Sequence, residues 1–106
     1  MQSKQLEEEQ SLERAYQKLR IYSALDHRIR INAIFLVADN PGVSFNELVR
    51  MTKVPATKLA YHLGLLKSED LVKFTYERRG KATSRYFITE LGKTMVRELR
   101  SETRKL

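Results

Sequence analysis

The stretch VSFNELVRMTKVPATKLAYHLGLLKS, residues 43–68, decides the fold of this chain. Ser44 and Glu47 have the Ser-x-x-Glu spacing of a capping box, which marks the start of a helix. That first helix is short, because Pro55 follows soon after it and proline is favoured in the first turn of a new helix. The pattern therefore predicts two helices joined by a tight connection of about three residues.

The second of these helices, predicted for residues 55–68, has two distinct faces. Its buried face consists of leucines spaced at i, i+4 and i+7: Leu59, Leu63 and Leu66. The opposite face carries side chains that can bind bases or phosphates: Thr57, Lys58, Tyr61 and, at its margin, His62. A histidine at the margin of a helix is as often a packing residue, so both interpretations of His62 stay open.

After residue 70 the helical periodicity changes to that of strands. Apolar and polar residues alternate along 72–77, as in a half-buried strand, and a second strand is predicted for 84–88. The loop 78–83 between them contains Gly80, so the two strands are predicted to form a hairpin. Basic side chains dominate the loop and the start of the second strand: Arg78, Arg79, Lys81 and Arg85.

The net charge of +7 is concentrated in this hairpin. Residues 71–88 carry five basic side chains and one acidic one, whereas residues 1–22 are neutral overall. A basic chain favours a polyanionic partner, either nucleic acid or an anionic membrane surface. A peripheral membrane binder places its basic residues along one amphipathic helix, and the helix-forming N-terminal segment sums to zero. Duplex DNA is therefore the favoured partner, and no membrane is expected.

Helices flank the central region on both sides. Residues 3–22 form a helix with one narrow apolar stripe, and a second helix starts at Asp26 as N-cap and stops before Pro41. Thr89 is predicted to cap the last helix. The expected fold is mainly α with a β-hairpin (α+β), in the order α-α-α-α-β-β-α. The terminal helices are expected to form a dimer interface through Leu12, Tyr16, Leu19, Met95 and Leu99.

Length and composition exclude several classes of protein. A chain of 106 residues with 42% hydrophobic residues has the size of one domain. It contains no cysteine, so a disulfide scaffold, a thiolate metal site and a catalytic cysteine are excluded. Only two histidines are present, and no paired carboxylates flank a predicted pocket. We therefore expect neither an enzyme nor a bound metal or other cofactor.

Two helices joined by a tight turn and followed by a basic hairpin describe a winged helix-turn-helix. In this arrangement the helix at 55–68 enters the major groove, and the basic wing at 78–85 lies on the backbone or in the minor groove. The chain also resembles winged-helix regulators of the ArsR/MarR type, most closely small archaeal members, over residues 24–100. The resemblance rests on the segments LDHRIRI (25–31), SFNEL (44–48), AYHLGLL (60–66), DLV (70–72) and YFITELG (86–92).

This resemblance implies a homodimeric transcription factor that binds double-stranded DNA in the cytoplasm, associated with the nucleoid. By position, the resemblance places Thr57, Lys58, Tyr61 and His62 on the recognition helix. It places the basic residues of the hairpin on the wing. Residues 1–23 would then be a dimerisation or packing helix, 24–100 the DNA-binding domain, and 101–106 the end of the last helix.

Two departures from the family pattern matter. Metal-sensing relatives bind the metal through cysteines, or through Asp and His on the last helix. This chain has no cysteine, and residues 89–106 contain no Asp and no His, so metal sensing is not expected. Asp70 stands where many relatives have glycine, and Asp tolerates the left-handed conformation better than most residues. Two other functions stay open: a weakly specific chromatin or architectural DNA-binding protein, and a protein–protein interaction module. The residues identify no small-molecule effector.

Overall fold

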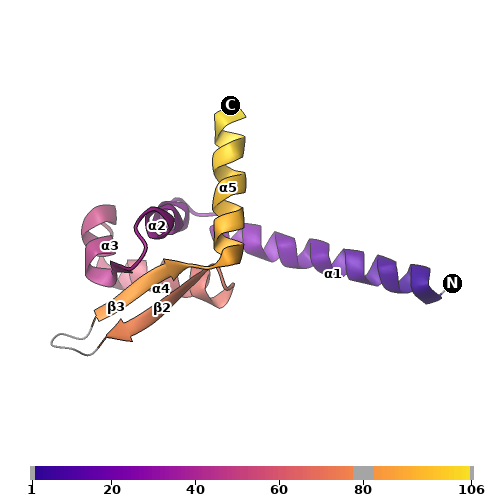
Figure 1. Ribbon diagram of the computed structural model, residues 1–106, viewed down its shortest axis with the longest axis horizontal. Helices are drawn as coiled ribbons and strands as arrows, with labels where there is room; N and C mark the ends of the chain where they lie inside the picture. Colours follow the sequence, from indigo (N-terminus) through magenta and orange to yellow (C-terminus); the bar gives the residue numbers. More distant parts are fainter. Residues whose placement is uncertain (1, 78–82, 106) are drawn as a thin grey trace.

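The computed structural model describes residues 2–77 and 83–105 of the chain (Figure 1). Arg78, Arg79 and Lys81 of the predicted wing lie outside the described residues. The described elements are, in chain order, α1 (Gln2–Leu25), α2 (Arg28–Asp39), β1 (Val43–Ser44), α3 (Phe45–Thr52), α4 (Ala56–Ser68), β2 (Val72–Glu77), β3 (Thr83–Ile88) and α5 (Glu90–Lys105). The predicted helices and the predicted hairpin are all present in the predicted order.

The sheet contains one strand more than the sequence predicts. The short strand β1 pairs antiparallel with β3, which makes a three-stranded sheet in the order β1-β3-β2. Two residues are too few to show strand periodicity, so this strand was not predicted. The Arg85 guanidinium secures it by donating from Nη1 to the carbonyl oxygen of Gly42 at 3.1 Å.

The core lies where α2, α3 and α4 meet the base of the sheet. Its largest fully buried side chains are Ile34, Leu48, Leu59, Leu63, Leu66, Leu71, Val37 and Val72. From α5, Met95 joins this core and is only 3% exposed. Met95 therefore packs inside a single chain, which leaves little of its side chain accessible for the dimer interface where it is expected.

The capping box at the start of α3 is confirmed. Glu47 donates its backbone N–H to Ser44 Oγ at 3.1 Å, and the Glu47 carboxylate accepts from the backbone N–H of Ser44 at 3.4 Å. After α3, Lys53 adopts a left-handed conformation with φ 58°, and α4 begins at Ala56, with Pro55 as its N-cap. The turn between the two helices therefore has about the predicted length.

The N-cap of α2 differs from the prediction by one residue. His27, not Asp26, is the cap, because its ring Nδ1 accepts the backbone N–H of Ile29 at 3.1 Å. Asp26 instead lies in the turn that closes α1, where its N–H donates to the carbonyl of Ser23 at 3.2 Å. An imidazole nitrogen serves here as the acceptor that a carboxylate was expected to provide.

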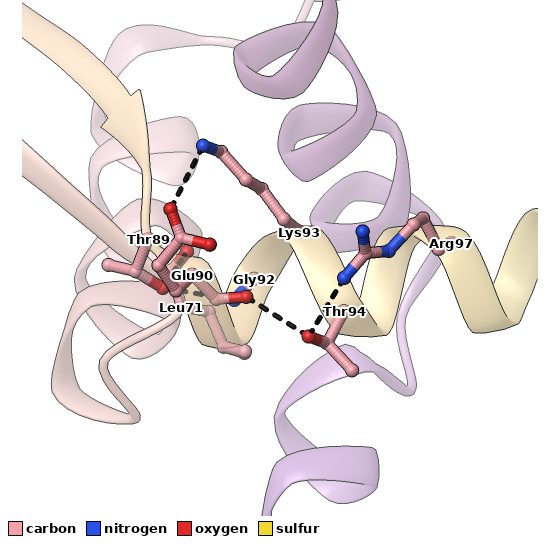
Figure 2. Close-up of polar contacts among 7 residues, drawn as sticks. All are labelled: Leu71, Thr89, Glu90, Gly92, Lys93, Thr94 and Arg97. Carbon is pink, nitrogen blue, oxygen red and sulfur yellow. Dashed lines mark hydrogen bonds and ion pairs between the residues drawn. The ribbon is translucent and has the colours of Figure 1, made fainter.

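A compact polar junction joins the sheet to α5 (Figure 2). Thr89 caps the helix as predicted, since its Oγ accepts the backbone N–H of Gly92 at 3.0 Å. The same hydroxyl donates to the carbonyl of Asp70 at 2.7 Å, and the Thr89 N–H donates to the carbonyl of Leu71 at 3.2 Å. Asp70 has the left-handed φ of 59° that the sequence suggested. These bonds hold the start of α5 against the end of the α4–β2 connection.

Helix α1 projects away from the rest of the molecule, as Figure 1 shows. Only its C-terminal part packs on the body, through Ile21, Ala24 and Leu25. An ion pair between Arg20 and Glu69, at 3.1 Å, adds a polar contact with the C-terminal end of α4. The projecting helix accounts for the elongated shape, with a longest extent of 61 Å.

Candidate nucleic-acid interface

The inner face of α4 is fixed in the core by its three leucines. Leu59 and Leu66 are fully buried, and Leu63 is 2% exposed. This confirms the buried face that the i, i+4, i+7 spacing predicts. A helix held this firmly can present its outer side chains in a defined orientation, which readout of a duplex requires.

The outer face of α4 is exposed and carries no carboxylate. Thr57, Lys58 and Tyr61 are exposed, and Tyr61, at 64%, is among the most exposed aromatic residues of the described chain. Ala60 and Gly64, which are also exposed, have little or no side chain, so they do not project from the helix surface. A Cβ added at Gly64 would meet nothing within 4 Å, so no described residue requires a glycine there. The face offers hydroxyl, ammonium and phenol groups to a large partner.

His62 lies beneath this face and not on it. Its side chain is 4% exposed, and its Nδ1 lies 3.0 Å from Nη1 of Arg30 on α2. Burial is the main cause that lowers the pKa of His62, and the electrostatic influence of His27, Arg30 and Lys58 lowers it further. Of the two interpretations left open by the sequence, the structure favours the packing one.

The hairpin of β2 and β3 projects from the body beside α4 (Figure 1). Val72 at its base is buried, whereas the strand residues from Lys73 to Glu77 are all exposed. An aromatic pair lies on the hairpin, with the rings of Phe74 and Tyr86 5.8 Å apart. Alternation alone predicted a half-buried strand, because it does not reveal how far a hairpin extends beyond the core.

The side chain of Lys67 connects the end of α4 to this hairpin. Its Nζ lies 4.1 Å from the centre of the Phe74 ring, which is cation–π geometry. Lys67 is not among the residues that the sequence pattern predicts for the interface. Its place one turn beyond Leu63, on a helix followed at once by a strand, was the available signal. The contact adds a second ammonium group to the side of the molecule that α4 and the hairpin share.

Arg85 makes its described contacts within the chain. Its Nε pairs with Glu77 Oε2 at 3.2 Å across the hairpin, in addition to its bond to the Gly42 carbonyl. Its side chain remains 40% exposed, so part of it is still accessible. The structure therefore gives Arg85 a role within the sheet, whatever else it contacts.

The predicted interface residues of α1 lie on its exposed surface. Leu12, Tyr16 and Leu19 are 72%, 61% and 66% exposed. Leu99 of α5, by contrast, is half-buried and packs against the core. Exposed leucines in an aligned stripe are unusual for an isolated helix in water.

Two kinds of feature are absent from the described part of the chain. Within residues 2–77 and 83–105, no group of three or more metal-ligating side chains comes together. In the same ranges, no helix is long and apolar enough to cross a bilayer.

Comparison with solved structures shows the fold. HlyU from Vibrio cholerae N16961 is 21% identical, with 83% of this chain and 92% of that chain covered and a TM-score of 0.71. The transcriptional repressor BigR from Xylella fastidiosa is 22% identical, with coverages of 89% and 90% and a TM-score of 0.72. A predicted DNA-binding transcriptional regulator from E. coli is 25% identical, with coverages of 87% and 95% and a TM-score of 0.70.

The chain folds as a winged helix-turn-helix. In that fold, α3 and α4 are the helix-turn-helix, α4 is the second helix of the pair, and β2 with β3 is the wing. No protein-family model matches the sequence, and no curated protein matches it. The likeness is therefore one of structure at low sequence identity.

Proposed function

We propose that this winged-helix protein is a transcriptional regulator that binds specific sequences in double-stranded DNA. The observation that carries the proposal is the outer face of α4, which is exposed and free of carboxylates above three buried leucines. The solved structures of the same fold include a transcriptional repressor and a predicted DNA-binding transcriptional regulator, which supports it. The net charge of +7 supports a polyanionic partner as well.

In this proposal α4 lies in the major groove and its N-terminal half reads the bases. Thr57 and Lys58 lie in the first turn, where side chains of a recognition helix reach base edges or phosphates. Tyr61 lies one turn further and contacts a phosphate or sugar. The wing residues Arg78, Arg79 and Lys81 complete the interface on the DNA backbone or in the minor groove.

We further propose that the protein acts as a homodimer. The exposed stripe Leu12, Tyr16 and Leu19 of α1 is covered by the same stripe, or by the body, of a second copy. A two-fold dimer places two copies of α4 in successive major grooves, about 34 Å apart. The expected binding site is therefore a palindrome whose half-sites are one helical turn apart.

The test is selection of bound duplexes from a random library, followed by titration of a selected duplex and of its scrambled version. We expect enrichment of a palindromic motif and a preference for the selected duplex of at least about 10³-fold. Lys58→Gln and Tyr61→Ala should each weaken binding to the selected duplex about tenfold, within the usual range of 1–3 kcal/mol per contact. Lys93→Gln removes the same charge from α5, which is not part of the proposed interface, and should leave binding unchanged.

Two results would overturn the proposal. Tight binding without preference would indicate an architectural DNA-binding protein. No salt-dependent binding to any duplex would indicate that the exposed faces serve a protein partner.

A further inference from the structure

Beneath the exposed face of α4 lies a small cluster formed by His27, Arg30 and His62, which the proposed DNA contacts do not use. The two imidazole rings are 4.3 Å apart. Arg30 connects three helices: it belongs to α2, its Nε donates to the Ala24 carbonyl near the end of α1 at 2.6 Å, and its Nη1 reaches His62 on α4. The cluster thus links the projecting helix to the proposed recognition helix.

The hydrogen bonds in this cluster require neutral histidines. A guanidinium nitrogen can only donate, so His62 Nδ1 must accept from Arg30, with a lone pair and no proton. His27 Nδ1 likewise accepts from the backbone N–H of Ile29. A proton added to His62 Nδ1 would face the N–H of Arg30 and break the contact.

The neighbours that act electrostatically on His62 all oppose its protonation. Arg30 and the exposed His27 face it from the start of α2, and Lys58 is the cationic group from α4 itself. Glu69, which borders the same hollow as Arg30, is already paired with Arg20 of α1. Burial and these neighbours hold the pKa of His62 below its ordinary value of 6.5.

We propose that Arg30 is a positioning residue of the DNA-binding site: it fixes α4 through neutral His62, and acidification releases this contact and weakens DNA binding. The inference rests on the proposed function. A protonated His62 beside Arg30 places two cations 3.0 Å apart in a buried position, and α4 must shift or His62 must leave its site. Either change disturbs the orientation of the outer face.

The sign of the pH effect separates this proposal from direct contact. A histidine that touched a phosphate would bind DNA more tightly when protonated, because it would add a positive charge. A histidine that positions α4 only when neutral must do the opposite. Below the pKa of His62, affinity should fall by up to about tenfold per pH unit, the limit for one linked proton.

The experiment is titration of the selected duplex between pH 7.5 and 5.0 at constant ionic strength, with the fold checked by circular dichroism at each pH. We expect the wild-type protein to lose affinity below the lowered pKa of His62, toward the acid end of this range. His62→Asn keeps an acceptor near the position of Nδ1 without a titratable proton, and should bind at all these pH values with little change. His27→Asn keeps the helix cap and is the matched control, because it should retain the acid sensitivity. Arg30→Met should weaken binding at pH 7.5 and flatten the profile.

A second measurement needs no variant that might misfold. NMR titration of the imidazole C–H signals gives the pKa of His62 in the free and DNA-bound protein. Linkage requires the bound value to be the lower one. An equal or higher bound value, or a wild-type affinity that stays flat or rises with acid, would overturn the inference while the proposed function stands. Absence of binding at pH 7.5 would instead overturn the proposed function.

Discussion

Gly92 of α5 lies directly against the backbone carbonyl of Leu71, where the end of the sheet meets the last helix (Figure 2). A Cβ at this position would overlap the Leu71 carbonyl oxygen and would lie 2.7 Å from Cγ1 of Ile88. The Leu71 carbonyl cannot move easily, because Leu71 is fully buried and its carbonyl accepts the N–H of Thr89. The close approach lets α5 start immediately after β3.

Replacing this glycine should therefore destabilise the protein. Gly92→Ala is expected to lower the free energy of unfolding by about 1–3 kcal/mol, the usual cost of overpacking. Gly64→Ala is the matched control, because its Cβ meets nothing and alanine is the better helix former, by about 1 kcal/mol. Urea denaturation of both variants checks this. Equal effects in the two would contradict the close approach at Gly92.

The ion pair between Asp39 and Arg100 should tie α5 to the end of α2. The guanidinium binds both carboxylate oxygens, at 3.0 and 2.7 Å, and stacks 4.6 Å from the centre of the Phe35 ring. Both side chains are substantially exposed, so Arg100→Gln should cost no more than about 1 kcal/mol of unfolding free energy. Thermal unfolding at low and high salt checks this, and a loss that salt does not reduce would contradict an exposed pair.

The same pair predicts a pH dependence of stability. Its hydrogen bonds to Arg100 lower the pKa of Asp39 below the ordinary 3.8. The contribution is therefore complete above pH 3.8 and is lost as the pH falls through the lower folded value. In Asp39→Asn this step should be missing from the stability profile between pH 5 and 2, measured by urea denaturation at each pH. A profile identical to the wild type would show that the pair contributes nothing.

The exposed stripe of α1 predicts the effect of charge on assembly. Leu12→Glu and Leu19→Glu should each convert a dimer into monomers, because a carboxylate cannot be buried unpaired between two copies. Gln10→Glu, on the opposite side of the helix, is the control and should stay dimeric. Sedimentation velocity distinguishes these outcomes. A wild-type protein that sediments as a monomer would refute the proposed homodimer directly.

The elements that the sequence predicts well are those with local causes. Ser44 and Glu47 form their capping box three residues apart, and Thr89 caps α5 through Gly92 at the same separation. Asp70 shows the left-handed backbone that its position suggested. In each case the interacting groups are close in sequence, so their spacing alone carries the information.

The features that the sequence did not predict depend on contacts between distant segments. The strand β1 exists because the chain at Val43 meets Tyr86, and Arg85 turns back to Gly42. His62 is buried against Arg30, which lies 32 residues away in the sequence and contacts its Nδ1. Periodicity places a residue on a side of its helix, but it does not show which neighbour covers that side.

Binding of DNA by the outer face of α4 is tested most directly by the salt dependence of duplex affinity. We predict that log Kd of the wild-type protein for the selected duplex rises steeply with log salt, and that Lys58→Gln reduces the slope by about 1, as loss of one phosphate contact requires. Lys93→Gln should leave the slope unchanged. A Lys58→Gln variant with the same slope and affinity as the wild-type protein would contradict the claim.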